Sequence, residues 1–351
     1  MDFNSLVFPI PKASYNKKSF PGQLIWIPKK NFTYKDKIKY SINHDSKNIP
    51  KISKLNKKSI QGKLIYHNKS SSMVQSIPSI SFQIDNKFTE FEKIKEITTY
   101  IPCLFLKSKV PSEKILIYFH SNYKDLGNTF PLCSTISKNL NINVLSVEYP
   151  GYGVYKTQTL STADEITNDS EIIFKFINEV ESIKTNNIIL MGRCIGSGPA
   201  TYLAMKHNIL SLVLLSPFKS IKEAVKTMFP KLHFGNFLQN FVKERFNNYD
   251  NISKVESPVL LIHGKNDTTI PPIHSSEMIN QIKSPAKLVI PSAMTHNNFD
   301  FLQDVVVHIR DFIKVFTNEE IELNTDSTDE CIEDSQISID FPSWMYECPV
   351  N

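Results

Sequence analysis

The chain lacks closely spaced cysteine pairs and long apolar runs, and each absence excludes certain classes of protein. Its 5 cysteines among 351 residues are scattered, with no C-x-x-C pair, so neither a disulfide framework nor a zinc site is expected. The opening MDFNSLVFPIPK has no long apolar core, so neither a signal peptide nor a membrane span is predicted. Asp2 stands where N-myristoylation requires glycine, and the ending CPVN matches a prenylation signal poorly. We therefore expect a cytoplasmic protein without a metal or other cofactor.

Basic residues are missing from one end of the chain and acidic residues are scarce at the other. Residues 317–351 contain 10 acidic residues and no Lys or Arg, whereas residues 1–80 contain 15 Lys and 3 Asp, a net charge of +12. The basic end is either a solvated arm or a weak, salt-sensitive contact for an anionic membrane. It has no aromatic–basic recognition module, so no nucleic-acid partner is expected. We divide the chain into a partly ordered basic Lys/Asn/Ser-rich arm (1–80), a folded domain (81–316) and an acidic C-terminal tail (317–351).

From about residue 98 onward, short apolar β-branched runs alternate with helical patterns. One apolar stripe follows Thr162, which with Glu165 has the spacing of a capping box, and another runs through 302–316. Several of the apolar runs are hydrophobic on both faces, as in strands of a covered parallel sheet. The alternation predicts an α/β fold with a doubly wound, mostly parallel sheet. The expected strands are 98–106, 115–119, 142–148, 187–191, 211–216, 258–263 and 287–290.

Three residue types suited to nucleophilic catalysis follow three of these strands. The segment LMGRCIGSGPA places Cys194 at the apex of a strand-to-helix turn, a nucleophile elbow supported by Gly192 and Gly196. Asp267 lies in LLIHGKNDTTIP and His296 in PSAMTHNNF. Reactive groups in open α/β sheets gather beyond the carboxyl ends of strands, and α/β-hydrolases use this order of nucleophile, acid and histidine. We expect a catalytic triad in which His296 deprotonates the nucleophile and Asp267 fixes the imidazole tautomer.

Other polar residues near these strands are weaker candidates. Ser197 does not fit the nucleophile position. An elbow needs small residues two positions before and after its apex, and for Ser197 these are Ile195 and Pro199. We interpret His263 as structural. His120 belongs to a loop that follows the strand at 115–119.

The chain contains the segments YFHSNYKDLG, VEYPGYGVY, MGRCIGSGPA, NISKVESPVLLIHGKND and THNNF. They resemble blocks of the α/β-hydrolase superfamily, and in particular of the alpha/beta-hydrolase domain-containing protein 17 group, over roughly 98–316. The resemblance implies the α/β-hydrolase fold with a short helical lid insert, about 217–256. It also implies an enzyme that cleaves thioester-linked acyl chains from proteins at membranes, a depalmitoylating acyl-protein thioesterase. Carried across, Cys194 takes the nucleophile position, Asp267 the acid and His296 the base. The N–H of Ile195 and the loop at Ser121 or Asn122 would form the oxyanion hole.

Two departures from that group leave two alternatives open. Cys194 replaces the family's serine, and Ser121 stands where glycine normally follows the histidine. One alternative is an ester or thioester hydrolase with a Cys-His-Asp triad, acting on an acylated protein or a small acyl (thio)ester. A sulfur nucleophile favours thioester substrates, because the exchange of one thioester for another has a free-energy change close to zero. The other is an inactive pseudoenzyme that binds an acyl chain or a protein partner. The lid insert, rich in phenylalanine, either lines an acyl slot or packs onto the sheet.

Overall fold

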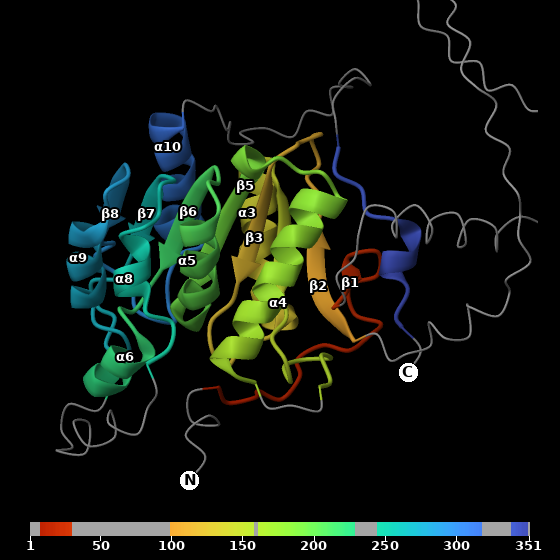
Figure 1. The fold of residues 1–351 in the computed structure, drawn as a ribbon, viewed down its shortest axis with the longest axis horizontal. Helices are drawn as coiled ribbons and strands as arrows, with labels where there is room; N and C mark the ends of the chain where they lie inside the picture. The colour runs from red at the N-terminus through yellow and green to blue at the C-terminus, as the bar shows by residue number, and fades with distance from the viewer. Residues whose placement is uncertain (1–7, 30–98, 158–160, 229–243, 318–337, 350–351) are drawn as a thin grey trace, which may run out of the picture.

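The computed structural model describes residues 8–29, 99–157, 161–228, 244–317 and 338–349, and its centre is one eight-stranded sheet. The strand order is β1-β2-β4-β3-β5-β6-β7-β8 (Figure 1). β1 and β2 run antiparallel to their neighbours, and all remaining pairs are parallel. The predicted doubly wound, mostly parallel sheet is confirmed. The strands are β1 Leu24–Pro28, β2 Tyr100–Leu106, β3 Ile115–Phe119, β4 Asn143–Val147, β5 Ile188–Arg193, β6 Ser211–Leu215, β7 Val259–Ile262 and β8 Ala286–Val289.

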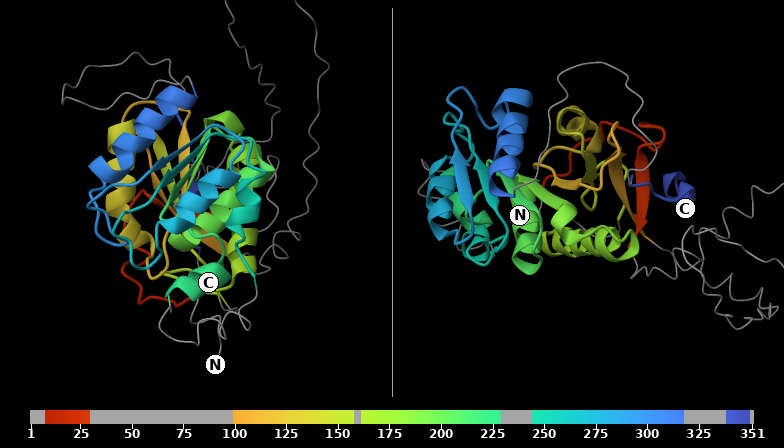
Figure 2. Two further views of the ribbon diagram at one scale, coloured as in Figure 1. Left: turned by 90° about the vertical axis from the view of Figure 1, so that its left-hand side faces the viewer. Right: turned by 90° about the horizontal axis from the view of Figure 1, so that it is seen from above.

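Helices cover both faces of the sheet and divide its core in two. Successive residues of a strand point to opposite faces, so Cys103 and Phe105 enter one core while Leu104 and Leu106 enter the other. α3 and α10 close one face, and α4 and α5 close the other (Figure 2). The helices are α3 Leu126–Leu140, α4 Ala163–Lys175, α5 Ser197–Lys206, α6 Ile221–Met228, α8 Asn248–Ile252, α9 Ile273–Met278 and α10 Val307–Phe316. Shorter turns are η2 Phe176–Val180, η3 Thr185–Asn187, η4 Cys194–Gly196, η5 Ile279–Gln281, η6 Leu302–Val306 and η7 Ser343–Tyr346.

One of the two hydrogen bonds of the expected capping box is present at the start of α4. The Thr162 hydroxyl accepts a hydrogen bond from the N–H of Glu165 at 3.1 Å. The Glu165 carboxylate instead lies 2.9 Å from Nζ of Lys29, which also lies 2.9 Å from Asp169. This ion-pair cluster fastens the end of β1 to α4.

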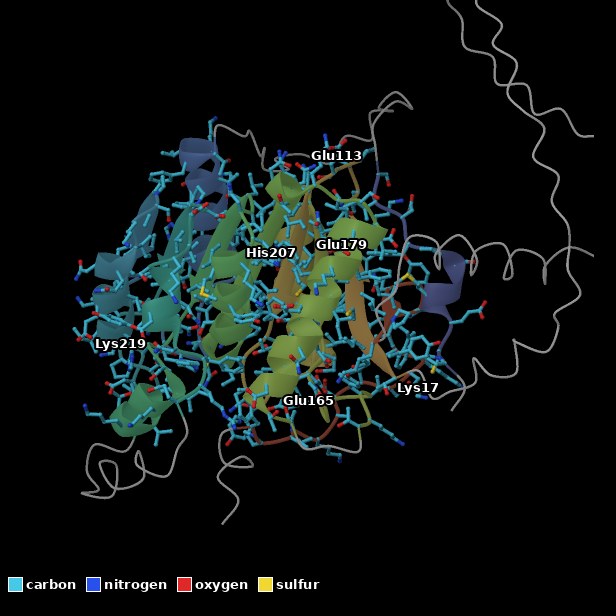
Figure 3. All side chains as sticks on the ribbon, in the orientation of Figure 1. Lys17, Glu113, Glu165, Glu179, His207 and Lys219 are labelled. Carbon is cyan, nitrogen blue, oxygen red and sulfur yellow. The ribbon has the colours of Figure 1, made fainter. Side chains whose placement is uncertain are left out.

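The N-terminal segment crosses the end of the sheet at which the parallel strands finish (Figure 1). Figure 3 marks the two ends: Glu113 precedes β3 at one end, and Glu165 lies in the first turn of α4 at the other. The ring of Phe8 packs edge-on against Phe246, with 6.3 Å between centroids. Residues 8–20 therefore lie against the loops that carry the functional candidates.

The C-terminal segment also packs onto the domain. Phe341 and Met345 are buried, and the Phe341 ring stands edge-on to Phe105 with centroids 4.6 Å apart. Residues 30–98 and 318–337 lie outside the described residues, so both alternatives for the basic arm, a solvated segment or a membrane contact, stay predictions. Within the described ranges, no helix combines the length and apolarity needed to span a bilayer.

The insert between β6 and β7 contains α6 and α8, as expected for a helical lid. Its residues 229–243 lie outside the described part of the chain, and four of its six phenylalanines fall there. The other two, Phe218 and Phe246, are buried in the core. The packing alternative therefore applies to these two rings.

Candidate active site

Cys194 occupies a strained turn between a strand and a helix. β5 ends at Arg193, residues 194–196 form a single tight turn, and α5 begins at Ser197. Cys194 has φ 52°, in the left-handed region that L-residues rarely adopt, and its side chain is half-buried. A non-glycine residue with such a conformation is characteristic of a nucleophile elbow.

The glycines on either side of Cys194 leave no room for a side chain. A Cβ on Gly192 would overlap the carbonyl oxygen of Gly196. A Cβ on Gly196 would overlap the carbonyl oxygen of Phe119 and lie 2.8 Å from that of His120. The elbow thus rests directly on the end of β3 and the start of the loop that follows it.

Asp267 and His296 form a buried hydrogen-bonded pair. Asp267 Oδ2 lies 2.7 Å from His296 Nδ1, while Oδ1 accepts from the N–H groups of Thr269 at 3.0 Å and Ile270 at 2.8 Å. Burial would raise the pKa of Asp267, yet hydrogen bonds from His263 and His296 hold it well below its ordinary value. Asp267 therefore remains a carboxylate and holds the Nδ1–H of His296 in place.

His296 also contacts Cys194, which completes a chain from carboxylate to sulfur. Burial alone would lower the pKa of His296, but its hydrogen bond to Asp267 and its hydrogen bond and charge interaction with Cys194 raise it from 6.5 to about 9. Because Nδ1 is engaged with Asp267, Nε2 is the nitrogen left for the sulfur. The structure thus brings together Cys194, Asp267 and His296, which are far apart in the sequence.

The weaker candidates have structural partners. Ser197 is the first residue of α5 and is buried; its hydroxyl donates to the carbonyl of Cys194 at 2.6 Å and accepts from Asn248 Nδ2 at 2.9 Å. The ring of His263 lies between Ser275 Oγ, 2.7 Å from Nδ1, and the Ile270 carbonyl, 2.8 Å from Nε2. His263 Nε2 is also 3.4 Å from Asp267 Oδ2, so this histidine supports the acid.

Arg193 fastens the histidine loop to the strand that carries Cys194. Its Nη2 donates to the carbonyl of His296 at 2.6 Å and lies 3.4 Å from Oδ1 of Asn297. The guanidinium stacks over the ring of Phe299, 4.8 Å from its centroid. In the sequence Arg193 directly precedes Cys194, whereas its contact with the carbonyl of His296 depends on the fold.

Two of the residues predicted for the oxyanion hole, Ser121 and Asn122, lie in the loop after β3. Ser121 is buried, and its hydroxyl has no hydrogen-bond partner among the described residues. Asn122 Oδ1 accepts from the hydroxyl of Tyr152 at 2.8 Å. Ile195 lies buried in the elbow turn, which touches this loop at His120. The N–H groups proposed for the oxyanion hole thus come from two segments in contact.

Glu148, Tyr15 and Asp125 surround this loop, and sequence reasoning did not single them out. Glu148 had a signal in the sequence, as the acidic last residue of the apolar strand expected over 142–148. Tyr15 had no comparable signal, because its partner Glu148 lies 133 residues away, and the bond that joins Asp125 to Ser14 spans 111 residues. Within the described ranges, no cluster of three or more His, Cys, Asp or Glu residues is arranged to hold a metal ion.

Comparisons with known proteins support the fold and the sequence resemblance. No family model matches the chain. Human alpha/beta hydrolase domain-containing protein 17B is 25% identical over 213 residues, which covers 61% of this chain and 70% of that protein. Alpha/beta hydrolase domain-containing protein 17C of Xenopus laevis is 26% identical over 215 residues, covering 61% and 66%. Protein bem46 of Schizosaccharomyces pombe is 30% identical over 191 residues, covering 52% and 62%. The matched part of the chain thus spans less than two thirds of the length of the Xenopus laevis protein and of bem46.

Solved structures show the same architecture at low sequence identity. The Pyrococcus furiosus esterase Pf2001 has a TM-score of 0.51 and 19% identity, covering 63% of this chain and 90% of that one. Est1E from Butyrivibrio proteoclasticus has a TM-score of 0.50 and 17% identity, covering 63% and 96%. The chain is therefore an α/β-hydrolase-fold protein, related in sequence to the alpha/beta hydrolase domain-containing protein 17 group and to bem46.

Proposed function

We propose that this chain hydrolyses acyl thioesters and activated carboxyl esters, with Cys194 as nucleophile, His296 as acid and base, and Asp267 as the orienting carboxylate. The observation that carries the proposal is the continuous contact from Asp267 through His296 to Cys194, at the positive-φ apex of an elbow. The resemblance to the protein 17 group extends the substrate class to S-acylated proteins, which makes the activity an acyl-protein thioesterase.

The first half of the reaction moves the acyl group onto Cys194. The thiolate attacks the thioester carbonyl, and the tetrahedral oxyanion receives hydrogen bonds from the N–H of Ile195 and the loop at 121–122. The intermediate then expels the substrate thiolate, which takes a proton from the His296 imidazolium. One thioester bond breaks and another forms, so this step is close to thermoneutral.

The second half of the reaction needs His296 as a base. Two of the causes that raise the pKa of His296 come from Cys194, namely its hydrogen bond and its charge. Acylation removes both, so the pKa of His296 falls below about 9 in the acyl-enzyme. The neutral ring can then deprotonate a water molecule, which attacks the acyl carbonyl and returns Cys194 to the thiolate while His296 keeps the proton.

The proposal is tested with purified full-length protein and a short-chain acyl thioester. Hydrolysis is followed by chromatography of the released acid, because thiol-detecting reagents would also modify the protein. Cys194→Ala should abolish turnover, and iodoacetamide should inactivate the wild type. Cys348 is the other half-buried cysteine of the described residues, so Cys348→Ser should retain both turnover and sensitivity to iodoacetamide.

The same assay separates an enzyme from a pseudoenzyme. A wild type without turnover, in which Cys194→Ser restores hydrolysis, would contradict the proposal and indicate a site that has lost its nucleophile. Turnover that persists in Cys194→Ala would place the chemistry elsewhere.

A further inference from the structure

Glu148 is a fully buried carboxylate at the point where four segments meet. It directly follows β4 and has no solvent exposure. Its Oε1 lies 3.1 Å from Nε2 of His120 and accepts from the N–H of Tyr149 at 3.2 Å. Its Oε2 accepts from the hydroxyl of Tyr15 at 2.7 Å and from the N–H of Leu126 at 3.2 Å. A buried carboxylate without partners is strongly destabilising, so these contacts determine where the group lies.

The contacts of Glu148 bracket the loop that is expected to bind the oxyanion. His120 is the first residue after β3, and Leu126 is the first residue of α3. Ser121 and Asn122 lie between them. Glu148 therefore ties the two ends of this loop to one rigid group at the end of the neighbouring strand.

The N-terminal segment holds the same loop from outside. The N–H of Ser14 donates to Asp125 Oδ2 at 2.6 Å, and the Ser14 hydroxyl donates to Oδ1 of the same carboxylate. Asp125 is the N-cap of α3, and its side chain also accepts from the N–H of Asn128. Ser14 and Tyr15 thus bind both the cap of α3 and the carboxylate beneath the loop.

The packing around these bonds leaves no spare volume. A Cβ on Gly127 would overlap Oγ of Ser14, and a Cβ on Gly153 would overlap Oε2 of Glu148 and the Tyr15 ring. Burial, and next the negative charge of Glu148, raise the pKa of Tyr15 far above its ordinary value. The Tyr15 phenol therefore stays protonated and remains a donor to Glu148.

We infer that Tyr15 and Glu148 are positioning residues that hold the oxyanion loop 120–126 in register with the elbow. This inference rests on the proposed function. An oxyanion hole works only when its donors are fixed before the charge develops, and loss of one donor typically slows turnover by ~10²–10³-fold. Loss of the Tyr15 hydroxyl would leave Glu148 one donor short and free the loop to shift. The N-terminal segment then forms part of the catalytic apparatus.

The test compares two reactions of Cys194 that differ in their need for an oxyanion hole. Alkylation by iodoacetamide develops no oxyanion, whereas acylation by a p-nitrophenyl ester passes through one. Tyr15→Phe should slow acylation at saturating ester by at least ~10-fold, leaving the half-saturating ester concentration and the alkylation rate unchanged.

Tyr155→Phe is the matched control. Tyr155 is also buried, and its hydroxyl donates to a carboxylate at 2.8 Å, but that carboxylate is Asp169 on α4. The control removes one phenol–carboxylate bond without touching the oxyanion loop, and both rates should match the wild type. Glu148→Gln, if it folds, should slow acylation further than Tyr15→Phe, because it removes the charge that all four partners share.

The outcomes separate the inference from the proposed function. A wild type that is alkylated but never acylated overturns the proposed function, and this inference with it. A wild type that is acylated, together with an equally fast Tyr15→Phe, overturns the inference alone. Equal slowing in Tyr15→Phe and Tyr155→Phe also overturns it, because the effect would then reflect general loss of packing.

Discussion

Asp267→Asn should lower the pKa of His296 and flatten the pH dependence of stability. In the folded chain, burial opposes the charged ring, yet Asp267 and Cys194 raise the pKa of His296 from 6.5 to about 9. One pH unit corresponds to ~1.4 kcal/mol, so the site favours the charged ring by about 3 kcal/mol. The His296 side chain is only 9% exposed, so solvent screens this preference little. Asparagine keeps an acceptor for Nδ1 without the charge, and we expect the pKa to fall by about one pH unit or more.

The sign of the stability effect follows from the direction of the shift. A histidine whose pKa is raised on folding contributes its full stabilisation below 6.5 and loses it as the pH rises through about 9. The pKa of Asp267 is lowered instead, so its own contribution is lost only in acid. Between 6.5 and 9, the free energy of unfolding should therefore decline in the wild type and decline less in Asp267→Asn.

Urea unfolding at closely spaced pH values measures this difference. Asp311→Asn, at a half-exposed carboxylate paired with Arg310, is the control and should keep the wild-type slope. Asp267→Asn will be less stable at every pH because a buried charged pair is broken, so the slope and not the absolute value is the readout. Equal slopes in the wild type and Asp267→Asn would refute the claim that Asp267 raises the pKa of His296.

Three further substitutions test the packing of the elbow, of the segment before β1 and of the C-terminal segment. Gly196→Ala should cost ~3 kcal/mol or more, because its Cβ would overlap the backbone oxygen of Phe119. Gly22→Ala should cost only ~1 kcal/mol, since its φ is +70° but no atom lies within 4 Å; equal losses in urea unfolding would contradict this reasoning. Phe341→Ala should lower stability by ~3 kcal/mol through loss of its contact with Phe105, with turnover unchanged below the melting transition. Thermal unfolding without a shift in Tm would show that the C-terminal segment adds no stability.

The sheet could be predicted because its strands carry their environment in their own residues. The run Ile188 to Met191 is apolar at every position, and every position is buried, because helices cover both faces of β5. β1 likewise coincides with the apolar run LIWIP, and all five of its residues are buried. Local patterns of this kind do not depend on knowing the partner strand.

The three residues of the proposed triad could also be predicted, because each follows a predicted strand and the topology brings strand ends together. The groups that hold them could not. Tyr15 and Glu148 are 133 positions apart, and Arg193 meets the carbonyl of His296 103 positions away. No periodicity or motif encodes such contacts; they depend on side-chain directions fixed only once the sheet is assembled.

The cost of the Asp267–His296 pair itself favours chemistry over a purely structural role. Bringing an ionised carboxylate and an imidazolium out of water costs several kcal/mol each, and apolar residues of similar volume often give equal or greater stability. The pair nevertheless lies buried beside a half-exposed thiol, in a turn whose φ of 52° is itself strained. Packing at this edge of the sheet requires neither the buried charged pair nor the strained turn. A site that transfers a proton to and from sulfur uses both features. An acid shielded from water holds the imidazole ring more firmly, and the strained turn makes the nucleophile project from the backbone towards a carbonyl.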